Sequence, residues 1–230
     1  MHIAIIPDGN RRWAKKQGFL PAMGHEQGAA ALEALFDPAI ELGVTWLTCW
    51  GLSIANLTRR SRIELASLER IICTQFNRAK NHPRVLGEEV SIRVLGDWQS
   101  KLSPKTQSII REVVESTKHH TRLFLTILLA YDGNSDMVRA VQAIANKAER
   151  GACKHVTPSL VKEHLITKDL PSVDLLIRTG GDPHLSTGFL MWETQDAQLA
   201  FPPCLWPEFT SEMFRNIISN FHSKTRRFGS

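Results

Sequence analysis

The sequence has few cysteines, no long apolar run and no familiar nucleotide-binding motif. Its 230 residues include four cysteines without a CxxC pair, so neither a disulfide framework nor a zinc site is indicated and reduced thiols are expected: Cys49, Cys73, Cys153 and Cys204. No apolar stretch approaches the ~18 residues that span a bilayer, and the N-terminus lacks the basic and apolar regions of a signal peptide. Neither GxGxxG nor GxxxxGK[ST] occurs. These absences favour a soluble, cytoplasmic protein.

The charge is only mildly basic. A net charge of +5 permits an anionic partner without choosing among nucleic acid, a membrane surface and a phosphorylated small molecule. Five tryptophans lie in apolar contexts without interleaved Lys or Arg, so we expect them in the core: Trp46, Trp50, Trp98, Trp192 and Trp206. Without aromatic side chains spaced among basic ones, a nucleic-acid partner is not expected.

Short apolar runs alternate with amphipathic stretches along the whole chain. Strands are predicted at residues 2–6, 44–50, 90–95, 123–130 and 173–177, with a weaker one at 199–201. Several of these runs are apolar at consecutive positions, which is typical of parallel strands covered on both faces. Helices are predicted at residues 32–40, divided by Pro38, and at 63–76, 102–117, 135–148, 158–165 and 211–221. The pattern predicts a single α/β domain, residues 1–230, with a central mostly parallel sheet flanked by helices.

Polar residues cluster directly after four of these strands. The segments are residues 7–13, 51–60, 131–136 and 178–186. Ligands of open parallel sheets bind outside the carboxyl ends of the strands. We therefore expect the four segments to converge on one functional rim.

Two of the segments have the chemistry of a phosphate site. Residues 8–12 combine a carboxylate, a glycine, an amide and two guanidinium groups, which suit a phosphate and a Mg²⁺ ion that keeps phosphate ligands. An ordinary Asp-Gly-Asn turn is the alternative. Residues 178–182 place an arginine before a glycine pair, which is a backbone concavity that favours anions. A loop with an incidental arginine is the alternative there.

Taken together and in order, these motifs resemble the cis-prenyltransferases, the undecaprenyl diphosphate synthase family. The matching segments extend over nearly the whole chain: residues 5–14, Gly24, His25, Gly28, Ser53, Asn56, Arg59, residues 174–181, residues 205–207 and residues 226–229. The resemblance implies one α/β domain, a homodimer and an apolar tunnel between the sheet and its helices. It also implies a transferase that uses Mg²⁺, condenses an allylic diphosphate with isopentenyl diphosphate, and releases diphosphate. A long product would bring the protein into peripheral contact with a membrane.

The resemblance also implies roles for individual residues. Asp8 corresponds to the Mg²⁺ ligand and Asn10 to a residue near proton abstraction, so both are the expected catalytic residues. The expected contacts of the allylic diphosphate are Gly9, Arg11, Arg12 and His25. The mobile loop that closes over the site holds Ser53, Asn56 and Arg59. The expected contacts of the second diphosphate are Arg178, His184 and Ser186, and Gln198 corresponds to a glutamate that supports the metal.

Several positions depart from the family pattern. An arginine is replaced by Pro21, the glutamate of the mobile loop by Ala55, the second arginine after residues 178–181 by His184, and the metal-supporting glutamate by Gln198. These changes weaken the expected second diphosphate site and metal site, because a neutral group binds an anion or Mg²⁺ less strongly than a charged one. Two alternatives therefore stay open. One is a specialised relative that couples two allylic units irregularly, cyclises one or transfers a prenyl group, and the other is a non-catalytic partner subunit.

Overall fold

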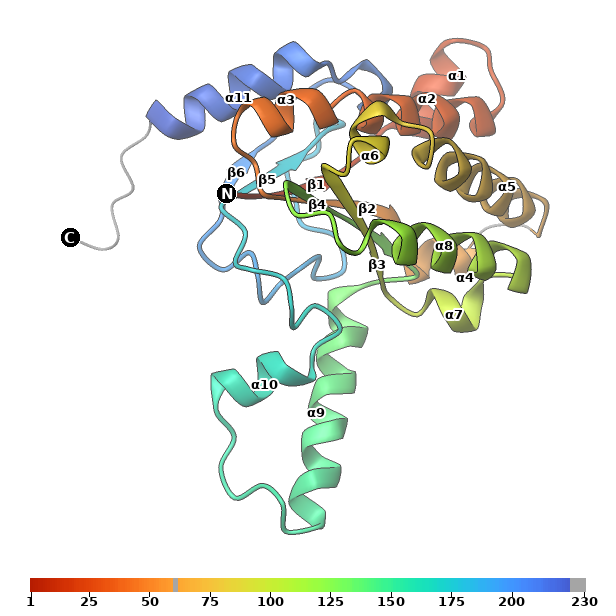
Figure 1. Ribbon diagram of the computed structural model, residues 1–230. Helices are drawn as coiled ribbons and strands as arrows, with labels where there is room; N and C mark the ends of the chain where they lie inside the picture. Colours follow the sequence, from red (N-terminus) through yellow and green to blue (C-terminus); the bar gives the residue numbers. More distant parts are fainter. Residues whose placement is uncertain (60–61, 224–230) are drawn as a thin grey trace.

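A computed structural model describes residues 1–59 and 62–223 of the chain (Figure 1). In chain order its elements are β1 (His2–Ile6), α1 (Asn10–Lys16), α2 (Pro21–Glu33), α3 (Phe36–Glu41), β2 (Trp46–Leu52), α4 (Ile54–Arg59), α5 (Arg62–Ala79), α6 (Pro83–Leu86), β3 (Val90–Leu95), α7 (Trp98–Lys101), α8 (Pro104–Thr117), β4 (Leu123–Leu129), α9 (Gly133–Glu149), α10 (Pro158–His164), β5 (Leu175–Arg178), β6 (Gln198–Ala200), the 3₁₀ helix η1 (Trp206–Glu208) and α11 (Ser211–Ser223).

The strands form one six-stranded sheet in the order β3-β4-β2-β1-β5-β6, and every neighbouring pair is parallel. The predicted α/β class with a central parallel sheet is confirmed. The bounds predicted for β1 and β3 are those observed, whereas β2 begins and ends two residues later than predicted. All carboxyl ends of the strands point to the same edge of the sheet.

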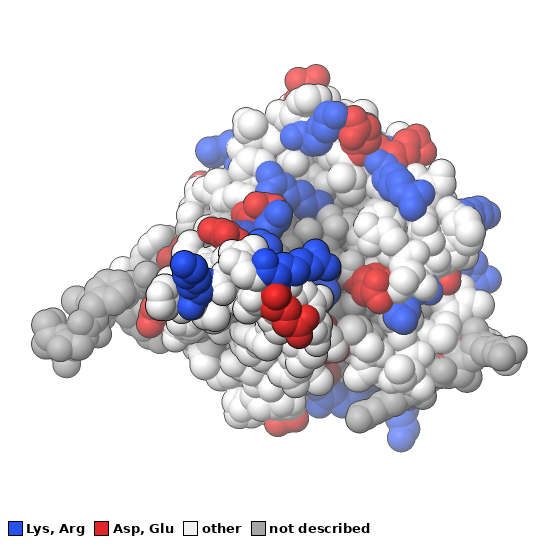
Figure 2. Space-filling model, turned by 90° about the horizontal axis from the view of Figure 1, so that it is seen from below, with Lys and Arg blue, Asp and Glu red and all other residues white. Residues whose placement is uncertain are grey.

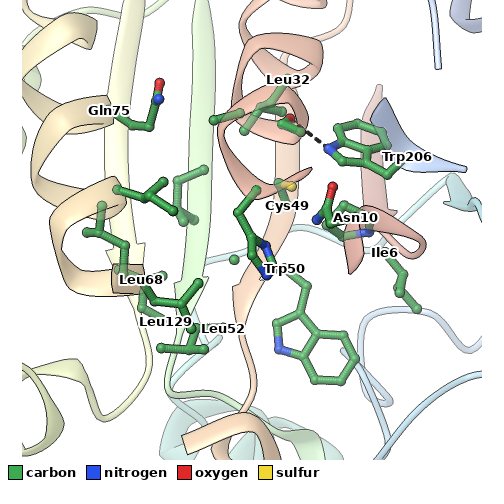
Figure 3. A pocket seen from close by; sticks show the side chains of 18 of the residues that line it. Ile6, Asn10, Leu32, Cys49, Trp50, Leu52, Leu68, Gln75, Leu129 and Trp206 are labelled. Atoms are coloured by element: carbon green, nitrogen blue, oxygen red, sulfur yellow. Dashed lines mark hydrogen bonds between the residues drawn. The ribbon is translucent and has the colours of Figure 1, made fainter. Parts of the chain in front are cut away.

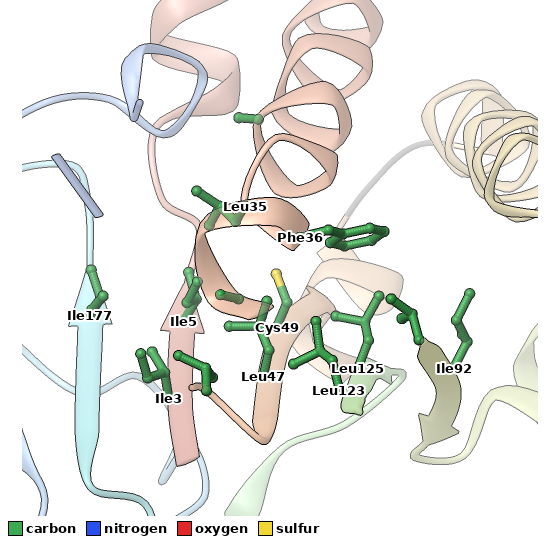
Figure 4. Close-up of a cluster of buried hydrophobic side chains, with 14 of the residues drawn as sticks. Ile3, Ile5, Leu35, Phe36, Leu47, Cys49, Ile92, Leu123, Leu125 and Ile177 are labelled. Atoms are coloured by element: carbon green, nitrogen blue, oxygen red, sulfur yellow. The ribbon is translucent and has the colours of Figure 1, made fainter. Parts of the chain in front are cut away.

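Both faces of the sheet are covered, as the consecutive apolar residues predicted. Ile3 and Ile5 of β1 point to the face that packs under helices α2 and α3 (Figure 4), while Ala4 and Ile6 point to the other face. The second face packs against the segment between α10 and β6, through residues such as Phe189. Strands β1, β2, β4 and β5 therefore contribute side chains to both apolar clusters.

The helices cover the two faces unequally. Helices α2, α3, α5, α6, α8 and α11 lie on one side of the sheet, whereas α9 and α10 project from the other side as an arm (Figure 1). The helix predicted at 32–40 is divided, because α2 ends at Glu33 and α3 begins at Phe36 with Pro38 in its first turn. Seen from the side of the arm, Lys and Arg lie interspersed with Asp and Glu (Figure 2).

The tryptophans and cysteines follow their expected burial only in part. Trp50, Trp98 and Trp206 are buried, but Trp46 and Trp192 are half-buried, and Trp46 lies under the guanidinium of Arg93 at 4.7 Å from its ring centre. All four cysteines are free, and Cys49 is the fully buried one. Within residues 1–59 and 62–223, no helix has the length and apolar character needed to cross a bilayer.

Candidate functional site

A cavity of about 580 Å³ opens at the carboxyl edge of the sheet. Its mouth is polar and contains Asp8, Arg12 and Arg178, whereas its interior is largely apolar and extends between α2, α5 and the strands β2, β3 and β4 (Figure 3). The cavity reaches down to Ile92 and Leu125, which pair in the first half of their strands. A ligand with one charged end and one apolar end matches this division.

The backbone of Asp8 is fixed at the end of β1. Its amide donates to Thr179 Oγ1 at 3.0 Å, and its carbonyl accepts from the same hydroxyl at 2.8 Å and from the amide of Trp206 at 2.9 Å. Thr179 is fully buried, so this link between the loops after β1 and β5 is shielded from water. Thr179 is a supporting residue that sequence reasoning did not single out, although it lies inside the recognised Arg-Thr-Gly-Gly motif.

The carboxylate of Asp8 lies between two guanidinium groups. Oδ1 accepts from Arg12 at 3.1 Å and Oδ2 accepts from Arg178 at 2.7 Å. The Asp8 side chain is 33% exposed and Arg12 is 52% exposed, while Arg178 is only 5% exposed. Two cations and one accessible carboxylate thus meet at the cavity mouth, as predicted for the carboxyl ends of β1 and β5.

Two glycines allow the loops after β1 and β5 to pack closely against their neighbours. Gly180 has a φ of +96°, and a Cβ there would lie 2.4 Å from a terminal nitrogen of Arg12. Gly9 has a φ of +115°, and a Cβ there would lie 2.9 Å from the side chain of Leu205. Both positions require a left-handed backbone that favours glycine, so the two loops depend on it.

Asn10 is held against helix α2. A Cβ on Gly28 would lie 2.3 Å from Asn10 Oδ1 and 2.8 Å from Trp206 Cδ1, so the missing side chain makes room for the amide. Trp206 Nε1 donates to the carbonyl of Gly28 at 2.7 Å (Figure 3). Asn10 Oδ1 is buried without a hydrogen-bond partner among the described residues, which leaves an acceptor beside the cavity.

The segment predicted as a loop after β2 is the short helix α4. Ser53 caps it, because Ser53 Oγ accepts from the amide of Asn56 at 3.1 Å, and both residues line the cavity. Ala55, where the family pattern has a glutamate, lines it too. Arg59 ends α4, but its side chain and the whole of Arg60 lie outside the described part of the chain, as does the predicted motif at residues 226–229.

Around Arg178, the loop after β5 contributes its backbone and one hydroxyl. One guanidinium nitrogen of Arg178 donates to Ser186 Oγ at 2.7 Å and to the carbonyl of His184 at 3.0 Å. Ser186 lines the cavity, whereas the His184 side chain does not and is 47% exposed. His184 is therefore near the predicted second site, but it does not line the cavity.

Two expected members of the rim lie elsewhere. Gln198 begins β6 and pairs with Leu175, which pairs with Ile3, so its position is roughly 15 Å along the strands from Asp8 at ~3.3 Å a residue. This register places Gln198 at the amino edge of the sheet, so the fold does not bring it to Asp8 of the same protomer. Residues 131–136 also do not line the cavity, since Asp132 caps α9 and Asp136 is buried against Ile166 and Thr167.

Other residues of the site shape its apolar part. His25, Gly28 and Leu32 of α2 face Leu68, Ile72 and Gln75 of α5 across the cavity. Cys49 lies between them on β2, and burial raises the pKa of its thiol to about 12, so the group stays neutral at physiological pH. Helical periodicity predicted α5, but only the packing shows which of its residues face the cavity.

The chain matches a family model described as putative undecaprenyl diphosphate synthase over residues 6–229. It is 36% identical to a ditrans,polycis-undecaprenyl-diphosphate synthase ((2E,6E)-farnesyl-diphosphate specific) of Pseudomonas putida, over 99% of this chain and 90% of that protein. It is 34% identical to the protein of the same description from Escherichia coli, over 99% of this chain and 89% of that one.

Two solved structures have a similar fold. The crystal structure of lavandulyl diphosphate synthase from Lavandula x intermedia in complex with dimethylallyl diphosphate has a TM-score of 0.92 and 30% sequence identity, covering 100% of this chain and 98% of that one. The structure of a probable undecaprenyl diphosphate synthase from Campylobacter jejuni has a TM-score of 0.78 and 26% identity, with the same coverage of 100% and 98%.

Proposed function

Because this chain belongs to the undecaprenyl diphosphate synthase family of transferases, the cis-prenyltransferases, we propose that it condenses an allylic diphosphate with isopentenyl diphosphate and releases diphosphate. One observation carries the proposal: Asp8 and two guanidinium groups lie at the polar mouth of a largely apolar cavity. Isoprenoid diphosphates have the same division into a charged head and an apolar chain. The family and its transferase class are established by the match over the whole chain.

The residues divide between the two substrates. Gly9, Arg11 and Arg12 face the cavity and would hold the allylic diphosphate, with His25 beside them. Arg178 and Ser186 would hold the diphosphate of the second substrate. Guanidinium groups suit this task because they bind phosphate oxygens through paired, charge-assisted hydrogen bonds and lower the cost of the negative charge that develops on the leaving group.

A Mg²⁺ ion fits this site with Asp8 as its protein ligand. The Asp8 carboxylate is accessible at the mouth, and among the described residues no group of three or more His, Cys, Asp or Glu side chains surrounds it. Mg²⁺ is commonly bound by one or two carboxylates, waters and substrate phosphates, so one carboxylate suffices. When bound, the ion would neutralise charge on the departing diphosphate. Asp8 would hold it, and Arg12 would stay beside the same phosphate groups.

Two aromatic rings in the cavity wall are candidates for limiting product length. Phe36 and Phe76 line the cavity and are both buried. Bulky side chains in the wall restrict the length of apolar chain that the cavity can hold.

Product analysis tests the proposal. The protein is incubated with Mg²⁺, isopentenyl diphosphate and, in separate reactions, dimethylallyl, geranyl or farnesyl diphosphate, and the dephosphorylated products are identified by mass spectrometry. We expect a product longer than the allylic substrate and loss of turnover with a chelator. Recovery of unchanged substrates in all three reactions would contradict the proposal.

Irregular coupling of two allylic diphosphates is the second candidate. It is favoured by His184, which replaces an arginine in the expected second site, and by the higher TM-score with the lavandulyl enzyme, 0.92 against 0.78. Dimethylallyl diphosphate supplied alone separates the two candidates. A ten-carbon diphosphate formed without isopentenyl diphosphate would support irregular coupling, while a strict requirement for isopentenyl diphosphate would support the first.

A homodimer is also proposed from family membership. Light scattering after gel filtration measures it directly, because the monomer mass is 25.9 kDa. A mass near one protomer at micromolar concentration would contradict this assembly.

A further inference from the structure

Three polar residues of the loop after β5, Asp182, His184 and Ser186, lie side by side, with the His184 ring between the other two. His184 Nδ1 lies 3.2 Å from Asp182 Oδ2, and His184 Nε2 lies 3.1 Å from Ser186 Oγ. The backbone supports the arrangement, because the amide of His184 donates to the carbonyl of Asp182 at 2.9 Å. Acid, imidazole and hydroxyl thus follow one another within five residues, and the hydroxyl lines the cavity.

The charges around these residues favour one direction of proton movement. The Asp182 carboxylate lies within ion-pair distance of Nδ1 and favours a proton there, which leaves Nε2 of the neutral ring as an acceptor for the Ser186 hydroxyl. On its other side, Ser186 Oγ accepts from Arg178 at 2.7 Å, and Asp8 lies behind that guanidinium at 2.7 Å. Arg178 stabilises negative charge on the hydroxyl oxygen, while Asp182 stabilises positive charge on the ring. Both neighbours therefore favour proton movement from Ser186 toward His184.

The geometry points to a proton relay in which Ser186 receives the proton lost at the end of prenyl coupling and His184 carries it to solvent. After the new carbon–carbon bond forms, a C–H bond beside the cationic carbon breaks and its electron pair becomes the double bond. The proton goes to Ser186 Oγ as the original hydroxyl proton passes to His184 Nε2. The imidazolium, paired with Asp182, then releases its proton to water.

Ser186 and His184 differ in their access to the cavity and to solvent. Ser186 faces the cavity, whereas the His184 side chain is 47% exposed and Asp182 is 65% exposed. A proton that reaches the ring therefore has direct contact with solvent. A histidine whose role was to bind the second diphosphate would instead line the cavity.

The relay rests on the proposed function, and a pH profile of the coupling step tests it. Single-turnover rates are measured from pH 5.5 to 9 for the wild type and for His184→Gln, which keeps a hydrogen-bonding side chain but cannot take up a proton. We expect the wild-type rate to fall at acid pH. His184→Gln should lower the rate about 100-fold and remove that acid limb. Its KM for the second substrate should change little.

Matched variants define the outcome. His119→Gln changes an exposed histidine far from this loop in the chain and should behave like the wild type. Asp182→Asn should reduce the rate less than His184→Gln, since the ring remains. A variant His184→Gln with a raised KM but an unchanged rate and pH profile would show that His184 only binds substrate, and would overturn the relay.

A measurement without turnover keeps this test separate from the proposed function. Nitrogen chemical shifts of the His184 ring at pH 8 report the tautomer, and we expect a proton on Nδ1 in the wild type and a mixture in Asp182→Asn. A proton on Nε2 in the wild type would overturn the relay even if coupling occurs. The expected tautomer in a protein that couples no isoprenoid diphosphates would instead contradict the proposed function.

Discussion

The two edges of the central sheet carry polar groups of different kinds. At the carboxyl edge, Asp8 lies between Arg12 and Arg178, and its side chain remains 33% exposed. At the amino edge, His2 is 2% exposed, its Nδ1 donates to the carbonyl of Pro171 at 2.9 Å, and its Nε2 accepts from Thr48 Oγ1 at 2.8 Å. One edge keeps charges accessible, whereas the other buries a neutral group.

The difference shows that one edge of the sheet holds groups that can bind a ligand, while the other edge holds groups that stabilise the fold. Burial lowers the pKa of His2 to about 4, because the charged ring would lose its hydration, so the group stays neutral and structural. Asp8 is surrounded by cations that diphosphate oxygens can also bind, so its hydrogen bonds can be exchanged for those of a ligand. Variants at the carboxyl edge should therefore change activity more than stability, and variants at the amino edge should do the reverse.

Removing the Asp8 carboxylate should have the largest effect. In Asp8→Asn we expect product formation to fall about 100- to 1,000-fold, because the group proposed to hold Mg²⁺ loses its charge. The free energy of unfolding should fall by only about 1 kcal/mol, since Arg178 keeps Ser186 Oγ and the carbonyl of His184 as acceptors. Radiolabelled product formation and urea unfolding measure the two effects.

Asp8→Ala is the matched variant. It removes the whole polar group, whereas Asp8→Asn removes the negative charge and keeps an amide. Both variants should lose activity alike if the charge is what matters. Normal turnover in either variant would contradict the role of Asp8, and a large loss of stability with intact turnover would reverse the comparison of the two edges.

His2 should give the next largest effect, on stability and not on activity. Its pKa is about 4 in the folded state and ~6.5 in the unfolded chain, so the unfolded state binds the proton more readily between these values. The stabilising contribution is present above about pH 6.5 and is lost as the pH falls toward 4, for a total of about 3 kcal/mol. Urea unfolding across this range should show a steeper decline in the wild type than in His2→Gln.

An exposed histidine provides the control for His2. His119→Gln should leave the stability profile parallel to that of the wild type, because that side chain is exposed. Parallel profiles for the wild type and His2→Gln would contradict the proposed burial of a neutral ring.

Much of the fold could be predicted from the sequence because buried parallel strands appear as short apolar runs. The bounds of β1 and β3 followed from this signal alone. The carboxyl-edge rule also placed Asp8 and Arg178 together, although 170 residues separate them. Both predictions depend on short sequence patterns. Because the strands pair in parallel, residues that follow different strands meet at the same edge of the sheet.

The remaining features depend on packing between distant segments. Gln198 could not be placed from motif order, because the register of β6 against β5 decides which edge it occupies. Residues 131–136 follow a strand as predicted, but burial of Asp136 against Ile166 draws that segment away from the cavity. His184 contacts Asp182 and Ser186 and does not line the cavity, which a diphosphate-binding expectation did not include.

Gly28→Ala should have an intermediate effect at the carboxyl edge. The added Cβ would lie 2.3 Å from Asn10 Oδ1, so the amide must move, and we expect activity to fall about 10-fold and stability by about 1–3 kcal/mol. In an Asn10→Ala background the activity penalty should shrink, because the displaced atom is gone. Gly43→Ala is the control, since no atom lies within 4 Å of its added Cβ and it should alter stability alone. Additive penalties would contradict the contact between Gly28 and Asn10.

Gln198 should give the smallest effect, although family resemblance assigns it to the metal. It lies level with Ile3 at the amino end of the strands, where its backbone N–H donates to the carbonyl of Asp174 at 3.0 Å. Gln198→Ala should change activity by less than about twofold, in keeping with an uncharged side chain away from the cavity. The Mg²⁺ concentration for half-maximal rate should be unchanged in Gln198→Ala. It should also be unchanged in Gln198→Glu, which restores the family residue. A lower Mg²⁺ requirement in Gln198→Glu would place this side chain at the metal and would break the distinction between the two edges, because the amino edge would then take part in the chemistry.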